Sequence, residues 1–221
     1  MIEKYYNGVI EQVAGGIGNV EHNSILVRYS NDFSIWDLES VNHYKDQTDI
    51  FFTCHEFSYN KIAEAYEPYL GLIRQMFHKY CSGTLEEFME ECDVYKLQRP
   101  VFESYFEKGF CERTEQILID EVEYEQERMR NSIVTMLQKL SEIRPVVIVL
   151  NRFQLASKST MQLSNSLLQV KNKNIGIVLG VNDVQSIPEF AHEEWDAICE
   201  SMDDRNMVYH IGNAGRNMEP D

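Results

Sequence analysis

The feature that most constrains the fold of this chain is a set of short apolar runs. Each run is rich in β-branched, aliphatic or aromatic residues and is bounded by polar or turn residues. The runs are Ser24–Tyr29, Asp49–Cys54, Pro145–Leu150 and Asn174–Gly180, with a weaker one at Met207–Ile211. Their apolar residues are continuous rather than alternating, as in strands buried on both faces of a parallel sheet. We therefore predict an α/β fold with a five-stranded, mostly parallel sheet.

Helical patterns separate these runs. Apolar residues recur at intervals of three and four through residues 62–80 and 129–140, as in helices with one buried face. Further along, Ser186 and Glu189 are three residues apart and predict a capping box at the start of a helix. The stretch from about residue 81 to 143 is acidic and helical in pattern, so we expect a helical insert between the second and third strands. The chain is interpreted as a single domain, 1–221, with a disordered tail at 213–221.

A glycine cluster near the N-terminus, "VAGGIGN", could be mistaken for a phosphate-binding loop. It contains Gly15, Gly16 and Gly18. A phosphate loop needs a strand before it, a helix after it, and a lysine and a hydroxyl beside its last glycine. Here Asn19 and Val20 take those two positions, a helical pattern precedes the glycines, and an apolar run follows them. We therefore predict that the glycines end a helix and bind no ligand.

Charge and cysteine content narrow the function classes. The formal net charge is -16, from 36 acidic and 20 basic residues. Such a surface repels phosphate backbones and anionic lipids, so we expect neither direct nucleic-acid binding nor membrane binding. The five cysteines are widely spaced and form no C-x-x-C pair, which favours reduced thiols over a metal site. With no basic and apolar leader and no apolar run of ~20 residues, the expected location is cytoplasmic.

Three longer segments carry a family resemblance. "LQKLSEIRPVVIVLNRFQLASKSTMQLSNSLLQ" resembles the Walker B region of the signal-transducing ATPases of the STAND class, within the AAA+ group. "FFTCHEFSYNKIAEAYEPYLGLIRQMF" is similar to the second strand and following helix of that class. "IGIVLGVND" is similar to its fourth strand, with the sensor position near Asn182. The resemblance implies a P-loop NTPase-like, three-layer αβα sandwich.

The same resemblance shows which catalytic groups are replaced. It puts the phosphate loop on "RYSNDFSI", where the lysine position falls near Ser34 and the Mg²⁺-binding hydroxyl near Ile35. Asn151 and Arg152 take the place of the acidic Walker B pair. The resemblance thus assigns a vestigial nucleotide site to Arg28, Tyr29, Ser30, Asn31, Asp32, Phe33, Ser34, Ile35, Asn151, Arg152 and Asn182. Phosphoryl transfer depends on positioned charge, so no catalytic residue and no cofactor are expected.

The resulting hypothesis is a degenerate ATPase, a pseudo-ATPase, that acts as a non-catalytic regulatory or interaction domain of a larger signal-transduction or transcription-regulating protein. Its partner would be another protein or a second copy, bound through a surface on the insert that includes Tyr105 and Phe106. One alternative is a weakly ATP-binding or atypical ATPase switch, with ATP and Mg²⁺ held through Arg152 or Arg28. A second is an α/β domain of unrelated role. His55, beside Glu56 at the end of the second predicted strand, is a further polar candidate.

Overall fold

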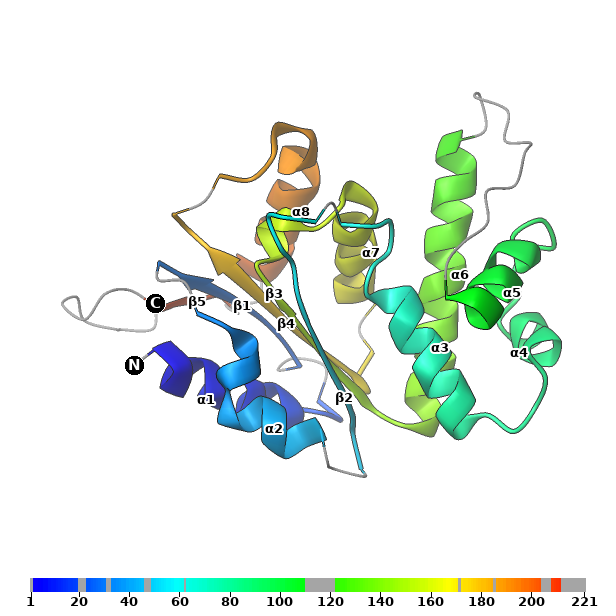
Figure 1. The fold of residues 1–221 in the computed structure, drawn as a ribbon, viewed down its shortest axis with the longest axis horizontal. Coiled ribbons are helices and arrows are strands. Elements are labelled where there is room, and N and C mark those ends of the chain that lie inside the picture. The colour runs from blue at the N-terminus through cyan, green and yellow to red at the C-terminus, as the bar shows by residue number, and fades with distance from the viewer. Residues whose placement is uncertain are drawn as a thin grey trace.

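The computed structural model describes residues 2–19, 23–30, 33–45, 49–61, 63–109, 122–170, 172–184, 186–203 and 208–211. Its centre is a parallel sheet in the order β2-β3-β4-β1-β5 (Figure 1). The strands are β1 (Ser24–Tyr29), β2 (Phe51–Glu56), β3 (Val146–Asn151), β4 (Ile175–Asn182) and the short edge strand β5 (Val208–Ile211). The α/β class and the parallel sheet predicted from the apolar runs are confirmed. The strands β3 and β4 are buried along their whole length, as continuous apolar runs require.

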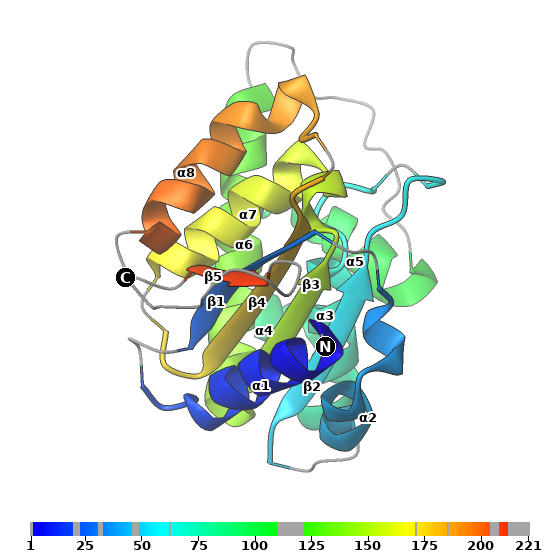
Figure 2. The same ribbon diagram turned by 90° about the vertical axis from the view of Figure 1, so that its left-hand side faces the viewer.

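Helices cover both faces of the sheet (Figures 1 and 2). One face carries α1 (Ile2–Gly15) and α2 (Glu39–Lys45). The other carries α3 (Tyr69–Tyr80), α6 (Val122–Ile143), α7 (Lys158–Gln169) and α8 (His192–Asp203). The remaining two, α4 (Leu85–Glu91) and α5 (Arg99–Lys108), lie outside α3 and α6. Each face has its own hydrophobic core, so the molecule consists of three layers.

The helix α1 packs closely on β4 because two glycines of that strand face it. A Cβ at Gly176 would lie 2.7 Å from the Val13 side chain, and a Cβ at Gly180 would overlap the Tyr6 hydroxyl. The absence of side chains at these two positions therefore lets the helix approach the sheet. This contact places Tyr6 beneath the carboxyl end of the sheet.

The glycine cluster ends α1, as predicted. The last helical residue is Gly15, and the Gly16 N–H donates to the Gln12 carbonyl at 2.8 Å. Only Gly18 among the three has a positive φ, 95°, and its N–H donates to the Lys173 carbonyl at 2.7 Å. The left-handed position is therefore Gly18, two residues beyond the hydrogen bond that closes the helix.

Two helix starts differ from the sequence predictions. The pattern at 62–80 becomes helical only at Tyr69, because Tyr66 has φ 60° and Pro68 precedes the first turn. The predicted capping box at Ser186 is not formed: a 3-10 turn spans Glu189–Ala191, and α8 begins at His192. A complete capping box occurs instead at Thr84 and Glu87, which start α4.

Among the described residues of the insert, all three phenylalanines, Phe88, Phe102 and Phe106, are buried in the core. Phe106 is 4% exposed, and its ring centroid lies 5.5 Å from that of Phe77. Tyr105 is half-buried and packs against the same core. The expectation that Phe106 contributes to an exposed surface is thus wrong, because its helical spacing points it toward α3. None of the described helices is long and apolar enough to cross a membrane.

Candidate functional site

The candidate site lies at the carboxyl ends of β1, β3 and β4. The chain leaves β1 toward α2 on one face of the sheet, whereas it leaves the neighbouring β4 toward α8 on the other. Such a switch point opens a crevice at the carboxyl edge, where open α/β sheets bind ligands. The strand register places Tyr29 opposite Asn182, and Glu56 opposite Asn151. The fold therefore gathers residues that the sequence analysis assigned to a vestigial nucleotide site.

An aromatic plug, defined as Tyr6, Tyr29 and Phe33, fills the α1 side of this edge. The Phe33 ring lies edge-on to both tyrosines, with centroids 4.9 Å from Tyr29 and 5.0 Å from Tyr6. The Tyr29 hydroxyl donates to Asn151 Oδ1 at 2.8 Å, and both residues are fully buried. Asn151, at the position of a Walker B carboxylate in the resemblance, thus orients a tyrosine ring.

Burial leaves part of this plug without hydrogen-bond partners. Among the described residues, neither the Tyr6 hydroxyl nor Asn151 Nδ2 has a partner. Burial is also the main reason why the pKa of Tyr6 is raised well above its usual range, with the nearby Tyr29 as a second cause. The neutral phenol is therefore the stable form of Tyr6.

Glu56 joins three of the surrounding segments. Its Oε1 lies 3.2 Å from Arg152 Nη1, and its Oε2 accepts a hydrogen bond from Ser34 Oγ at 3.3 Å. Arg152 has a left-handed backbone with φ 53°, which turns the chain sharply after β3. The carboxylate thus connects the end of β2 to the residue after β3 and to the turn before α2. Ion pairs of this kind hold both side chains in place when they are largely shielded from water.

Arg28 occupies the opposite face of the sheet. Its Nε lies 3.6 Å from Asp183 Oδ1, and its guanidinium carbon lies 5.8 Å from the centre of the Trp195 ring. Asp183 is itself fixed by its N–H, which donates to the Tyr29 carbonyl at 2.8 Å. Both arginines that could offer charge to a phosphate are therefore already neutralised by carboxylates.

The remaining residues of the assigned set have structural contacts. The Asn182 N–H donates to Gln154 Oε1 at 3.3 Å, and its Oδ1 accepts from the Val184 N–H at 3.0 Å. Ser34 caps the 3-10 turn that begins at Ile35, and Ile35 is fully buried. Ser30 is half-buried, and Asn31 and Asp32 lie outside the described residues.

Sequence reasoning missed Tyr6 and the role of Glu56. Nothing in the pattern of α1 distinguishes Tyr6 from an ordinary core residue, because its place in the site depends on the close approach to Gly180. Glu56 could have been identified, since an acidic residue at the end of a buried strand lies at the ligand-binding edge. Its neighbour His55 points to the other side and packs on Phe57 with ring centroids 4.6 Å apart.

These contacts define what the edge can do chemically. Asp183 and Glu56 form ion pairs with arginines, and the Tyr6 and Tyr29 side chains are buried. The described residues contain no group of three side chains that could hold a metal ion. The four described cysteines are free, and burial raises the pKa of Cys54 to about 11. Comparison of the chain with protein-family models, curated proteins and solved structures finds no match.

Proposed function

We propose that the chain is a non-catalytic regulatory or interaction domain derived from a STAND/AAA+ ATPase. In this proposal the nucleotide site has been filled by protein side chains, and the P-loop NTPase-like fold is kept as a scaffold. The observation that carries the proposal is the buried Tyr29–Asn151 hydrogen bond at the carboxyl edge of the sheet. It joins the last residue of the first strand to the Walker B position of the resemblance, near which an ATPase would hold phosphate and metal.

The sheet topology is compatible with the proposed ancestry. The first strand lies inside the sheet, between the fourth and fifth strands, so its carboxyl end is at the switch point where α/β sheets bind ligands. The chain after the first strand also leads to a helix on the opposite face from the helices that follow the second, third and fourth strands. These features are compatible with descent from the class, while the plug supports loss of its chemistry.

The alternative of a weak nucleotide switch depends on the two arginines at the edge. A phosphate would have to displace Glu56 from Arg152 or Asp183 from Arg28. It would also have to displace the Phe33 ring, which packs against two tyrosines. Breaking an ion pair and displacing a packed ring both cost free energy and oppose nucleotide binding. We therefore favour a domain that binds no nucleotide.

Calorimetric titration with Mg²⁺-ATP tests this choice. The proposal predicts no saturable heat up to about 1 mM nucleotide. Titration over this concentration range would detect a binding free energy of about −4 kcal/mol or more favourable. The switch alternative predicts saturable binding that Arg152→Gln abolishes. Arg144→Gln is the matched control, because Arg144 pairs with Asp49 at the other end of the strands. Binding lost only in Arg152→Gln would refute the proposal.

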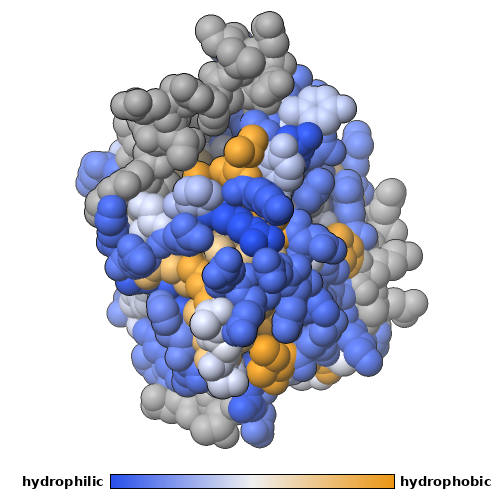
Figure 3. Space-filling view, turned by 90° about the vertical axis from the view of Figure 1, so that its right-hand side faces the viewer, coloured by the Kyte–Doolittle hydropathy of each residue, from blue (hydrophilic) through white to orange (hydrophobic). Residues whose placement is uncertain are grey.

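A partner surface on the insert would have to use its exposed residues. Among the described residues of the insert, the exposed large apolar residues are Tyr95, Leu97, Tyr124 and, at its end, Ile143. Arg128 lies over two of them, with its guanidinium carbon 4.4 Å from the Tyr95 ring centre and 5.7 Å from that of Tyr124. Figure 3 shows hydrophobic atoms on this side as separate spots among hydrophilic ones. Such a mixed surface suits a regulated contact more than a permanent one.

Self-association through this surface can be measured by sedimentation. If the surface binds a second copy, Leu97→Ser should abolish association while the thermal midpoint is unchanged, because Leu97 is 69% exposed. Phe106→Ser is the contrasting variant, since its buried ring should cost about 3–5 kcal/mol of stability. Association that survives Leu97→Ser would place the contact elsewhere.

A further inference from the structure

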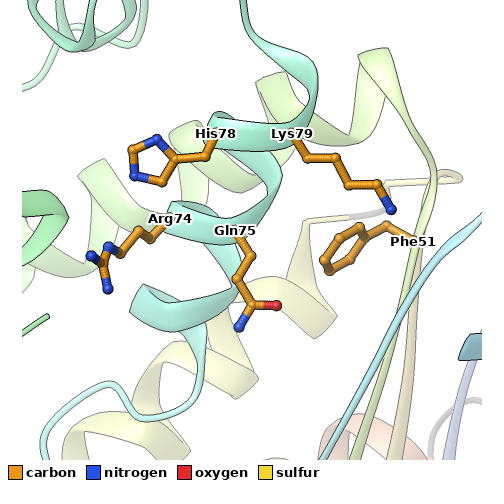
Figure 4. Close-up of a pocket in the computed structure, with 5 residues that line it drawn as sticks. All are labelled: Phe51, Arg74, Gln75, His78 and Lys79. Atoms are coloured by element: carbon orange, nitrogen blue, oxygen red, sulfur yellow. The ribbon is translucent and has the colours of Figure 1, made fainter.

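The outer face of α3 carries a group of polar side chains around a surface hollow. The group consists of Arg74, Gln75, His78 and Lys79. The last three follow Arg74 by one, four and five positions, so the four side chains form one continuous strip on the helix. The opposite strip of α3, which includes Ile73, Met76 and Phe77, is buried in the core. The helix thus presents hydrogen-bond donors outward. Figure 4 shows Arg74 and His78 together on one side of this strip, with Gln75 between them and Lys79.

The strip borders a shallow surface hollow, widely open to solvent, of about 490 Å³. The start of β2 forms one wall through Phe51, and the Lys79 Nζ lies 5.7 Å from the centre of its ring. On the side of Phe51 the hollow therefore offers the Lys79 ammonium and the nearby Gln75 amide, whereas Arg74 and His78 extend to its other side. A ligand could place a charged group against the donors and an apolar part against the ring.

Arg74 and Lys79 are held by contacts with a backbone carbonyl and with aromatic rings. Arg74 Nε donates to the Phe106 carbonyl at 2.8 Å, which fixes the guanidinium at the end of α5. Lys79 Nζ also lies 5.3 Å from the centre of the Tyr80 ring. Among the described residues, neither Arg74 nor Lys79 forms an ion pair with a carboxylate.

Other described cations are also held without a carboxylate: Arg130 Nη1 donates to Gln162 Oε1 at 3.4 Å, and Lys45 Nζ lies 4.7 Å from the centre of the Trp36 ring. The chain has a net charge of -16, and Arg28, Arg99, Arg128, Arg144 and Arg152 all pair with carboxylates. The strip on α3 carries two cations, Arg74 and Lys79, on an acidic protein. Cations near the end of a helix stabilise it through the helix dipole, which accounts for His78 and Lys79 in the last turn. It does not account for a donor-lined hollow beside them.

We propose that this hollow binds a small anionic ligand that carries a phosphate or a carboxylate group. Lys79 would supply the charge, Gln75 would donate a hydrogen bond, and Phe51, which lies on the same side as Lys79, would contact an apolar part of the ligand. Long polyanions such as nucleic acids do not fit, because the rest of the surface repels them. The site is separate from the carboxyl edge of the sheet and does not depend on the proposed ATPase ancestry.

Nuclear magnetic resonance titration of the whole chain tests this inference. Inorganic phosphate and acetate are added separately at constant ionic strength, with chloride as the reference, and the His78 ring and the α3 amides are followed. At least one of the two anions should cause saturable shifts, with half-saturation at about 1 mM or below. The anion that binds more tightly identifies the ligand group as phosphate or carboxylate.

Two variants distinguish a site from general charge attraction. Lys79→Gln should weaken binding at least about tenfold, the loss expected when one charged contact is removed. Lys4→Gln removes one charge from an exposed position of α1 on the other face and should leave binding unchanged. The inference is overturned if neither anion gives saturable shifts, or if both variants weaken binding equally. A role for Lys79 in the helix dipole alone would lower helix stability without changing the titration.

Discussion

The hydrogen bond between Tyr29 and Asn151 allows a quantitative test of the plug. Both residues are fully buried, and the oxygen atoms of the bond lie 2.8 Å apart. Tyr29→Phe removes the donor and leaves Asn151 Oδ1 buried without it. Asn151→Leu keeps a similar shape and removes the acceptor. Because a buried polar group that loses its partner costs about 1–3 kcal/mol, each single variant should lower the free energy of unfolding by that amount.

The double variant carries the decisive prediction. With both partners apolar, neither buried group is left unpaired, so the double variant should lose less stability than the two single losses added together. We expect a coupling energy of at least about 1 kcal/mol from urea unfolding at constant m-value. Tyr59→Phe is the control, because this tyrosine is 53% exposed and its loss should leave stability unchanged. Additive losses, within about 0.3 kcal/mol, would refute the hydrogen bond as a structural element of the site.

Further predictions concern backbone, packing and pH. Gly18→Ala should lower the free energy of unfolding by about 1 kcal/mol, because Gly18 has a φ of 95°. Gly15→Ala should not lower it, because Gly15 is helical and an added Cβ would meet no other atom. Urea midpoints of the two variants check this difference. Gly180→Ala should cost about 1–3 kcal/mol by overpacking against Tyr6, and a midpoint equal to that of the wild type would contradict the close approach of α1. Burial lowers the pKa of His55 below 6.5, although Glu67 opposes this, so the unfolded chain binds the proton more tightly. Stability should therefore fall as pH drops below 6.5, and His55→Asn should reduce that fall in urea midpoints; an unchanged slope would argue against it.

Much of the fold could be predicted because burial on both faces leaves a direct signal in sequence. The run Ser24–Tyr29 coincides with β1, and the other runs lie within two residues of their strands. The end of α1 at the glycines was equally predictable, since glycine tolerates the backbone that leaves a helix. Helix starts were less predictable, because Ser186 and Thr84 both precede a glutamate by three residues, yet only Thr84 forms a capping box.

The candidate site was predictable in part only. Its members on the strand ends, such as Asn151 and Arg152, follow from the position of the strands and from the family resemblance. The partners that give them their roles do not, because Tyr6 and Glu56 reach them from distant segments through packing. The burial of Phe106 was missed for a related reason, since acidic surroundings in sequence do not reveal which helix face meets α3.

The most direct test of the central claim is a comparison of ring contacts with and without nucleotide. The claim is that Tyr29 and Phe33 fill the edge where phosphates would bind. Nuclear Overhauser effects between these two rings should persist, without change, in about 5 mM Mg²⁺-ATP, a concentration that would reveal a Kd near 1 mM. Loss of these contacts, together with saturable shifts at Arg152 and Asp183, would show that nucleotide displaces the plug and would contradict the claim.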